Sequence, residues 1–163
     1  MFGRSAAAPG TEGRDYDRQM HYRKDIEVAR GAAEVFAYIA DFSRASEWDP
    51  GIAEARRLSE GSTAIGSRFE VIALFRGKRQ RFEYIVTEYD EGRRIALRGD
   101  GAKALSDDTI TVEDRDGRTC VTYEADLRLK GLYRVAEPFI GSTLERMGDE
   151  ALAGLKSKLD RAA

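Results

Sequence analysis

The stretch LYRVAEPFIGSTLERMGDEALAGLKSKLD, residues 132–160, decides the fold. Its apolar side chains recur three, four or one positions apart, which is the spacing of one face of an α-helix. They are Leu132, Val135, Phe139, Ile140, Leu144, Met147, Ala151, Leu152, Leu155 and Leu159. The pattern predicts a helix of close to 30 residues, roughly 45 Å long at 1.5 Å per residue. Pro138 must either begin the main helix or kink it, because proline has no N–H to donate.

The chain before this helix has the two-residue period of β-strands. Alternating runs bounded by turn residues predict strands near residues 22–28, 52–58, 69–75, 81–86, 95–97, 109–113 and 119–129. The short turns between most of them favour an antiparallel meander. Residues 32–40 and 41–48 predict two short helices after the first strand, with Ser43 as the expected N-cap of the second.

A helix this long presents too wide an apolar face for a single strand pair to cover. We therefore predict an α+β fold in which a curved six- to seven-stranded antiparallel sheet wraps the long C-terminal helix. Such a sheet rarely fills all the space beneath it, so an apolar cavity is expected. Residues 20–161 are predicted to form this single domain, and residues 1–19, rich in Gly, Ala, Asp and Arg, a disordered leader.

The bulk composition excludes several classes of function. The net charge of -2 gives no sign of a nucleic-acid-binding surface. One cysteine, Cys120, and one histidine, His21, argue against a disulfide, a metal site or catalysis by His21. We expect no metal and no cofactor. No apolar run is long enough to span a membrane, and we expect a cytoplasmic monomer or homodimer.

The ordered motifs resemble the START-like, polyketide cyclase/dehydrase superfamily, also called SRPBCC, whose fold is the helix grip. They are VFAYIAD at 35–41, EWDPG at 47–51, GSRFEV at 66–71, VTEY at 86–89, TCVTY at 119–123 and LKG at 129–131 before the helix. The resemblance covers about residues 20–161. It implies the fold but no particular substrate, because the superfamily includes aromatase/cyclases, lipid carriers, hormone receptors and chaperone activators.

Three hypotheses follow for the function. The first is a carrier or sensor that binds a small hydrophobic molecule, such as a lipid, polyketide or aromatic metabolite, in the internal cavity. The second is an aromatase/cyclase-like enzyme that folds a polyketide. The third is a protein-interaction module that uses the sheet surface or the basic hairpin at residues 76–81.

Alternation and helical spacing select the candidate ligand contacts. One strand face and one helix face are expected to line the cavity: Phe69, Val71, Phe82, Tyr84, Val86, Leu97, Val121, Tyr123, Val135, Phe139, Thr143 and Met147. Trp48 is either a core side chain or a gate near the cavity mouth. The resemblance places that mouth between the start of the long helix and the short helices, near Pro138.

The enzyme hypothesis has weak catalytic candidates in Tyr84, Arg98, Asp108 and Tyr123. Arg98 and Asp108 form either an inward pair or two separate solvent-facing side chains. At least two of the four would have to converge inside the cavity to move protons during catalysis.

Overall fold

The structure is a computed structural model, and it describes residues 19–161. The expected leader, residues 1–19, lies outside these residues apart from its last position. The elements follow one another as β1 (Met20–Val28), α1 (Ala32–Ala40), η1 (Phe42–Glu47), β2 (Ile52–Arg57), β3 (Arg68–Phe75), β4 (Lys78–Asp90), β5 (Arg94–Gly101), β6 (Ala104–Arg115), β7 (Arg118–Leu129), η2 (Gly131–Ala136) and α2 (Glu137–Arg161). Here η marks a 3₁₀-helix.

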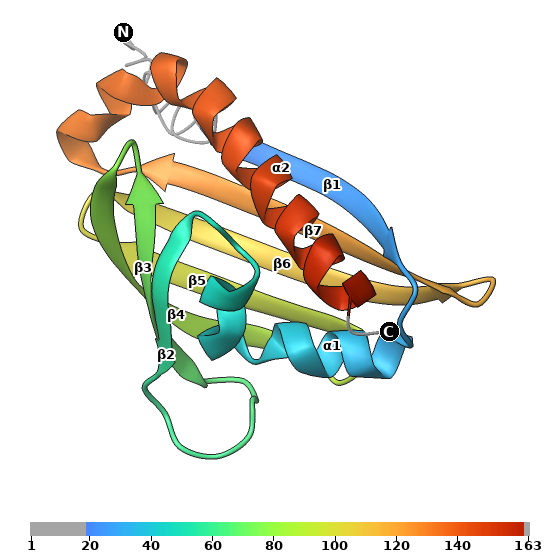
Figure 1. Ribbon diagram of the computed structural model, residues 1–163. Coiled ribbons are helices and arrows are strands. Elements are labelled where there is room, and N and C mark those ends of the chain that lie inside the picture. Colours follow the sequence, from blue (N-terminus) through green and yellow to red (C-terminus); the bar gives the residue numbers. More distant parts are fainter. Residues whose placement is uncertain (1–18, 162–163) are drawn as a thin grey trace, which may run out of the picture.

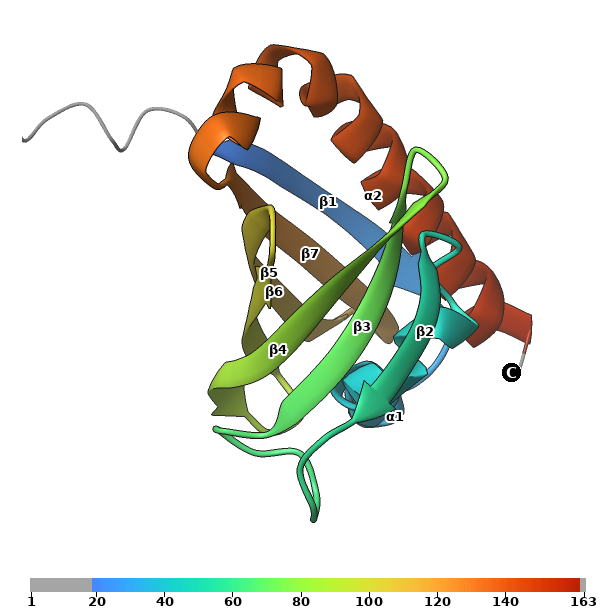
Figure 2. The ribbon, with the colours of Figure 1, turned by 90° about the vertical axis from the view of Figure 1, so that its left-hand side faces the viewer.

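The strands form one antiparallel sheet in the order β1-β7-β6-β5-β4-β3-β2. Strands β2 to β7 meander in sequence order, and β1 closes the far edge by pairing with β7. The sheet curls, and α2 crosses its open side, as Figures 1 and 2 show. The predicted helix-grip fold is therefore confirmed.

Two of the two-residue hairpin turns have positive φ at both central positions. Arg76 and Gly77 have φ values of 49° and 75°, and Asp116 and Gly117 have φ values of 55° and 81°. Positive φ at both central positions is the requirement of a type I′ turn, which matches the twist of the flanking strands. The turn at Arg76 and Gly77 fixes the register of β3 and β4, in which Phe75 pairs with Lys78.

The long helix begins later than its apolar stripe suggested. Residues 131–136 form the 3₁₀-helix η2, and Pro138 is the second residue of α2, where its missing N–H has no intrahelical partner to lose. The prediction that Leu132 and Val135 belong to the inward stripe is wrong, since they are 89% and 79% exposed. The 3₁₀ geometry of η2 breaks the 3.6-residue period that would have turned them inward.

Side chains fill one end of the space inside the sheet. Helix α1 and the C-terminal half of α2 meet the sheet there in a single apolar cluster that includes Val35, Ile39, Leu152, Leu155 and Leu159. The predicted cap of the second short helix is corrected, because the Asp41 carboxylate, rather than Ser43, accepts the N-terminal hydrogen bond of η1. This end of the fold is a closed core.

Two glycines of α2 allow close packing. A Cβ at Gly148 would lie 2.5 Å from the Tyr22 ring, and a Cβ at Gly154 would lie 2.0 Å from the Trp48 carbonyl oxygen. A Cβ at Gly141 would meet nothing within 4 Å. Gly148 and Gly154 therefore let α2 approach β1 and the segment after η1.

Candidate functional site

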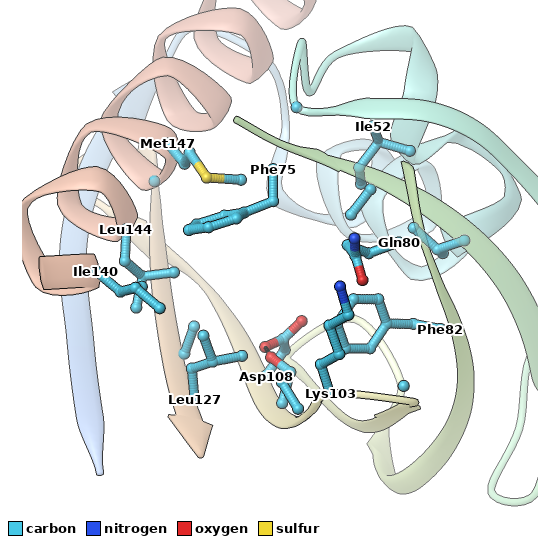
Figure 3. Close-up of a pocket in the computed structure, with 18 of the residues that line it drawn as sticks. Ile52, Phe75, Gln80, Phe82, Lys103, Asp108, Leu127, Ile140, Leu144 and Met147 are labelled. Carbon is cyan, nitrogen blue, oxygen red and sulfur yellow. Dashed lines mark hydrogen bonds between the residues drawn. The ribbon is translucent and has the colours of Figure 1, made fainter. Parts of the chain in front are cut away.

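A cavity of about 430 Å³ lies between the sheet and the N-terminal half of α2. Figure 3 shows its walls: Ile140, Leu144 and Met147 of α2 lie on one side, and Ile52, Gln80 and Phe82 on the other. This volume is within the range of small-molecule sites in proteins.

The mouth of the cavity lies beside two hairpin turns. The cavity-lining residues that are exposed to solvent are Arg76, Lys78, Arg81, Ala102, Tyr133 and Phe139. They come from the β3–β4 turn and the start of β4, from the β5–β6 turn, and from η2 and the start of α2. The opening is therefore at the end of the fold opposite α1.

Two glycines of β5 make room for aromatic rings on the cavity wall. Tyr84 pairs with Gly99 and Phe82 pairs with Gly101 across β4 and β5. A Cβ at Gly99 would lie 2.5 Å from the Tyr84 ring, and one at Gly101 would lie 2.8 Å from the Phe82 ring. The rings therefore lie flat over β5, which any larger residue at these positions would prevent.

A polar cluster interrupts the apolar wall at Asp108 on β6. The Ser106 hydroxyl donates a 2.6 Å hydrogen bond to the Asp108 carboxylate, and the hydroxyls of Tyr84 and Tyr123 are within hydrogen-bonding reach. Asp108 is 3% exposed. Burial raises its pKa from 3.8 to about 6, because desolvation outweighs the lowering effect of the Ser106, Tyr84 and Tyr123 hydroxyls.

A second carboxyl group, that of Asp49, lines the same cavity. It follows η1 and accepts a 2.7 Å hydrogen bond from the backbone N–H of Gly51. Burial, reinforced by the nearby charge of Asp108, raises the pKa of Asp49 to about 6. The cavity thus holds two carboxyl groups that titrate near neutral pH, a property common in sites of proton transfer.

The two phenols beside these carboxyl groups are held neutral. Desolvation and the charge of Asp108 raise the pKa of both Tyr84 and Tyr123 well above 10. Phe42 packs edge-on against the Tyr84 ring with a centroid distance of 5.1 Å. Tyr84 and Tyr123 are therefore positioned hydrogen-bond donors rather than bases.

The structure separates the predicted ligand contacts into two groups. Those that line the cavity are Trp48, Val71, Phe82, Tyr84, Tyr123, Phe139 and Met147. Those packed in the closed core are Phe69, Val86, Leu97 and Val121. All four core residues have the expected inward phase, but they lie beyond the cavity, where α1 and the C-terminal half of α2 cover the sheet.

Three further expectations are corrected. Val135 points to solvent from η2, and Thr143 is not part of the cavity wall. Trp48 is 6% exposed and lies in the buried part of the cavity wall, so it is not a gate at the mouth. Phe139 does lie at the mouth and is 72% exposed.

The possible inward pair of Arg98 and Asp108 does not form. These residues lie on opposite faces of the sheet: Asp108 faces the cavity, whereas Arg98 is exposed and donates a 2.6 Å hydrogen bond to Asp107. The remaining three catalytic candidates, Tyr84, Asp108 and Tyr123, converge inside the cavity.

Sequence reasoning missed several polar cavity residues, among them Asp49, Gln80, Lys103 and Ser106. Ser106 had a usable signal, because it lies two positions before Asp108 and so shares its strand face. Asp49 and Lys103 lie in loops, where no periodicity indicates a direction.

The convex face of the sheet carries paired charges. Arg79 of the basic hairpin pairs with Glu54, and Arg81, which also borders the cavity mouth, pairs with Glu70. His21 is exposed, and its Nδ1 lies 2.7 Å from the Asp126 carboxylate. Nothing in this arrangement favours the interaction-module hypothesis.

Within the range 19–161 no group of acidic, histidine and cysteine side chains is arranged to hold a metal ion. None of the helices in that range has the length and apolar content needed to cross a bilayer.

Comparison with known protein families gives a match to almost all of the described residues. The sequence profile of a family described as "Polyketide cyclase / dehydrase and lipid transport" matches residues 19–160. No curated protein matches the chain.

Solved structures share the fold at low sequence identity. A START superfamily protein from Mycobacterium smegmatis is 16% identical with a TM-score of 0.75, and the match covers 88% of this chain and 99% of that one. The protein TTHA0849 from Thermus thermophilus is 14% identical with a TM-score of 0.75, over 88% and 99% of the two chains. The Zhui aromatase/cyclase from Streptomyces sp. R1128 is 16% identical with a TM-score of 0.74, over 88% and 94%.

Proposed function

This chain belongs to the polyketide cyclase/dehydrase and lipid transport family, and we propose that it binds a small hydrophobic molecule in its cavity as a carrier or sensor. The observation that carries the proposal is a cavity of about 430 Å³ whose walls are mostly apolar and whose mouth opens beside the start of α2. A ligand that buries roughly 200 Å² of apolar surface there gains about 5 kcal/mol at 25 cal/mol per Å², before the costs of association.

The proposed contacts are the cavity-lining residues Trp48, Val71, Phe82, Tyr84, Tyr123, Phe139 and Met147, together with Ile52, Leu127, Ile140 and Leu144. Apolar side chains supply most of this surface and therefore the affinity. Asp49, Gln80, Lys103 and Asp108 supply the few polar groups that orient a ligand in such sites.

Binding of the neutral fluorophore N-phenyl-1-naphthylamine tests this proposal. Its emission rises when it enters an apolar site, and we expect saturable binding to the native protein. Ala73 of β3 lines the cavity, so Ala73→Trp places an indole there and should weaken binding at least tenfold. Ile72→Trp is the matched control, because Ile72 directly precedes Ala73 in β3 and is not part of the cavity wall. Absence of saturable binding, or equal binding by both variants, would contradict the proposal.

A second candidate function is catalysis of the aromatase/cyclase kind. It is favoured by the convergence of Asp49, Asp108, Tyr84 and Tyr123 in one cavity. A carboxylate with a pKa near 6 can accept a proton from the carbon between two carbonyls, and a neutral phenol can donate a hydrogen bond to the resulting enolate. Aldol closure followed by loss of water would then give a ring.

Catalysis is tested by incubating the protein with a poly-β-ketone thioester and following cyclised, dehydrated product by mass spectrometry. Asp108→Asn should lower the rate by at least a hundredfold while N-phenyl-1-naphthylamine binding remains. Asp107→Asn, on the opposite face of β6, should leave the rate unchanged. A rate equal to that of the uncatalysed reaction in the native protein would exclude catalysis of this ring closure.

A further inference from the structure

We propose that the ligand of this cavity is a hydrophobic acid, which has an apolar body and one anionic group, and that the Lys103 ammonium holds the acid end at the mouth. The inference rests on the proposed function, because it presupposes that the cavity binds a hydrophobic molecule. It is carried by the uneven distribution of charge along the cavity.

Lys103 is the central observation. It lies in the turn between β5 and β6, and Figure 3 shows its side chain pointing into the cavity toward Gln80. Its ammonium lies 5.2 Å from the centre of the Tyr133 ring. Within residues 19–161 no carboxylate forms an ion pair with Lys103. A cation facing an apolar space without an anion is available to a bound anion.

Two other cations near this mouth are paired with carboxylates, which sets Lys103 apart from them. Lys130, the residue directly before η2, pairs with Asp100, and Arg81 pairs with Glu70. Lys78, like Lys103, has no acidic partner in the described chain and also lines the cavity. The cavity lining at the mouth therefore carries positive charge, that of Lys103 and Lys78, which no carboxylate of the described residues compensates.

Arg76 adds to this positive end. It lines the cavity from the β3–β4 turn, and its Nη2 donates a 3.0 Å hydrogen bond to the Phe139 carbonyl oxygen. That bond fixes a guanidinium between the hairpin and the start of α2. The full cation remains, since a carbonyl oxygen does not neutralise it.

The inner end of the cavity has the opposite character. Asp49 and Asp108 both face the space there, and an anionic group placed beside them would be repelled when they are ionised. Lys103 immediately precedes β6 and Asp108 is its fifth residue, so the backbone positions of the two are up to about 17 Å apart at 3.3 Å per residue. A ligand long enough to span the cavity therefore has its lowest electrostatic energy with the anion at the mouth.

The region between the two ends is apolar. Leu127, Ile140 and Leu144 line it, and Figure 3 shows them facing the space between Lys103 and α2. This arrangement fits the body of an acid with one polar terminus. It discriminates against a neutral hydrocarbon, which would leave the Lys103 ammonium desolvated and unpaired.

A matched pair of fluorescent probes tests the proposal. 8-Anilino-1-naphthalenesulfonate and N-phenyl-1-naphthylamine share one aromatic body, and only the first carries an anionic group. We expect Lys103→Met to weaken binding of the sulfonate about tenfold, equivalent to about 1.4 kcal/mol. Binding of the neutral probe should change less than about twofold. Lys103→Gln is the second variant, in case the methionine disturbs folding.

Arg79→Gln is the matched charge control. It removes one positive charge from the β3–β4 hairpin, but Arg79 pairs with Glu54 and does not line the cavity. Binding of both probes should remain within about twofold of the native value. An equal loss of sulfonate binding in this control would show that general positive charge, rather than Lys103, attracts the anion and would overturn the proposal.

Displacement by dodecanoate and dodecanol extends the test to simple chain ligands. Dodecanoate should displace the neutral probe at about tenfold lower concentration than dodecanol, and the preference should vanish in Lys103→Met. If the neutral probe does not bind the native protein, the proposed function fails. If it binds, but the acid and the alcohol compete equally in both proteins, the cavity binds ligands and the inference about the acid is wrong.

Discussion

Replacing Asp108 with asparagine should make the protein more stable at neutral pH, although it removes a native cavity residue. The Asp108 carboxyl is 3% exposed, and burial raises its pKa from 3.8 to about 6. Above pH 6 the folded protein must hold a desolvated negative charge, whereas the unfolded chain holds that charge in water. Asparagine has the same shape without the charge.

The sign and size of the effect follow from proton linkage. The unfolded chain releases the proton near pH 4 and the folded protein near pH 6, so this carboxyl lowers the free energy of unfolding as pH rises through that window. The full difference is about 3 kcal/mol, at 1.36 kcal/mol per pKa unit. We therefore expect the advantage of Asp108→Asn over the native protein to increase between pH 4 and pH 6 and to stay constant above pH 7.

Urea denaturation at pH 5, 6, 7 and 8 measures this advantage for each variant. Asp107→Asn is the control, because Asp107 is the neighbouring residue on β6 and pairs with Arg98 and Arg128 on the convex face. It should lower stability by about 1 kcal/mol or less at pH 7. If native protein and Asp108→Asn keep a constant difference in unfolding free energy from pH 5 to pH 8, the argument from burial is refuted.

Two further substitutions test the packing, both by urea denaturation. Gly154→Ala should destabilise the protein by about 1–3 kcal/mol, because its Cβ would lie 2.0 Å from the Trp48 carbonyl oxygen. Gly141→Ala is the control: its Cβ would meet nothing within 4 Å, so it should stabilise α2 by up to about 1 kcal/mol. Equal effects of the two substitutions on the free energy of unfolding would contradict the close approach of α2 to Trp48. Phe69→Ala, in the closed core, should cost about 3–5 kcal/mol, whereas Phe139→Ala, at the exposed mouth, should cost less than about 0.5 kcal/mol. A similar cost for the two phenylalanines would show that Phe139 is not a mouth residue.

The sequence by itself determined the architecture of this protein. The apolar stripe from Phe139 to Leu159 predicted the long helix, and the alternation around Val71 and Tyr84 predicted strands with the correct inward phase. The turn at Arg76 and Gly77 marked a hairpin. These signals are local, because helical spacing, strand alternation and turn conformation depend on neighbouring residues along the chain.

Only the tertiary structure decided where the core ends and the cavity begins. Phe69 and Val71 share one face of β3 and both belong to the core cluster, yet only Val71 also lines the cavity. The difference depends on where α1 and α2 cross the sheet. The alternation within β3 predicts which face a side chain lies on, but it does not predict the position of these helices along the strand.

The charges of the site depended on tertiary structure in the same way. Arg98 and Asp108 both lie on strands, but the register of β5 and β6 places Arg98 beside Asp107 on the convex face and Asp108 in the cavity. Lys103 lies in a turn, and its lack of an acidic partner within the described residues is a property of the assembled mouth. The side chains along the strands and α2 could thus be anticipated as an inward set, but their burial, their partners and their electrostatic environment arise from contacts between segments distant in the chain.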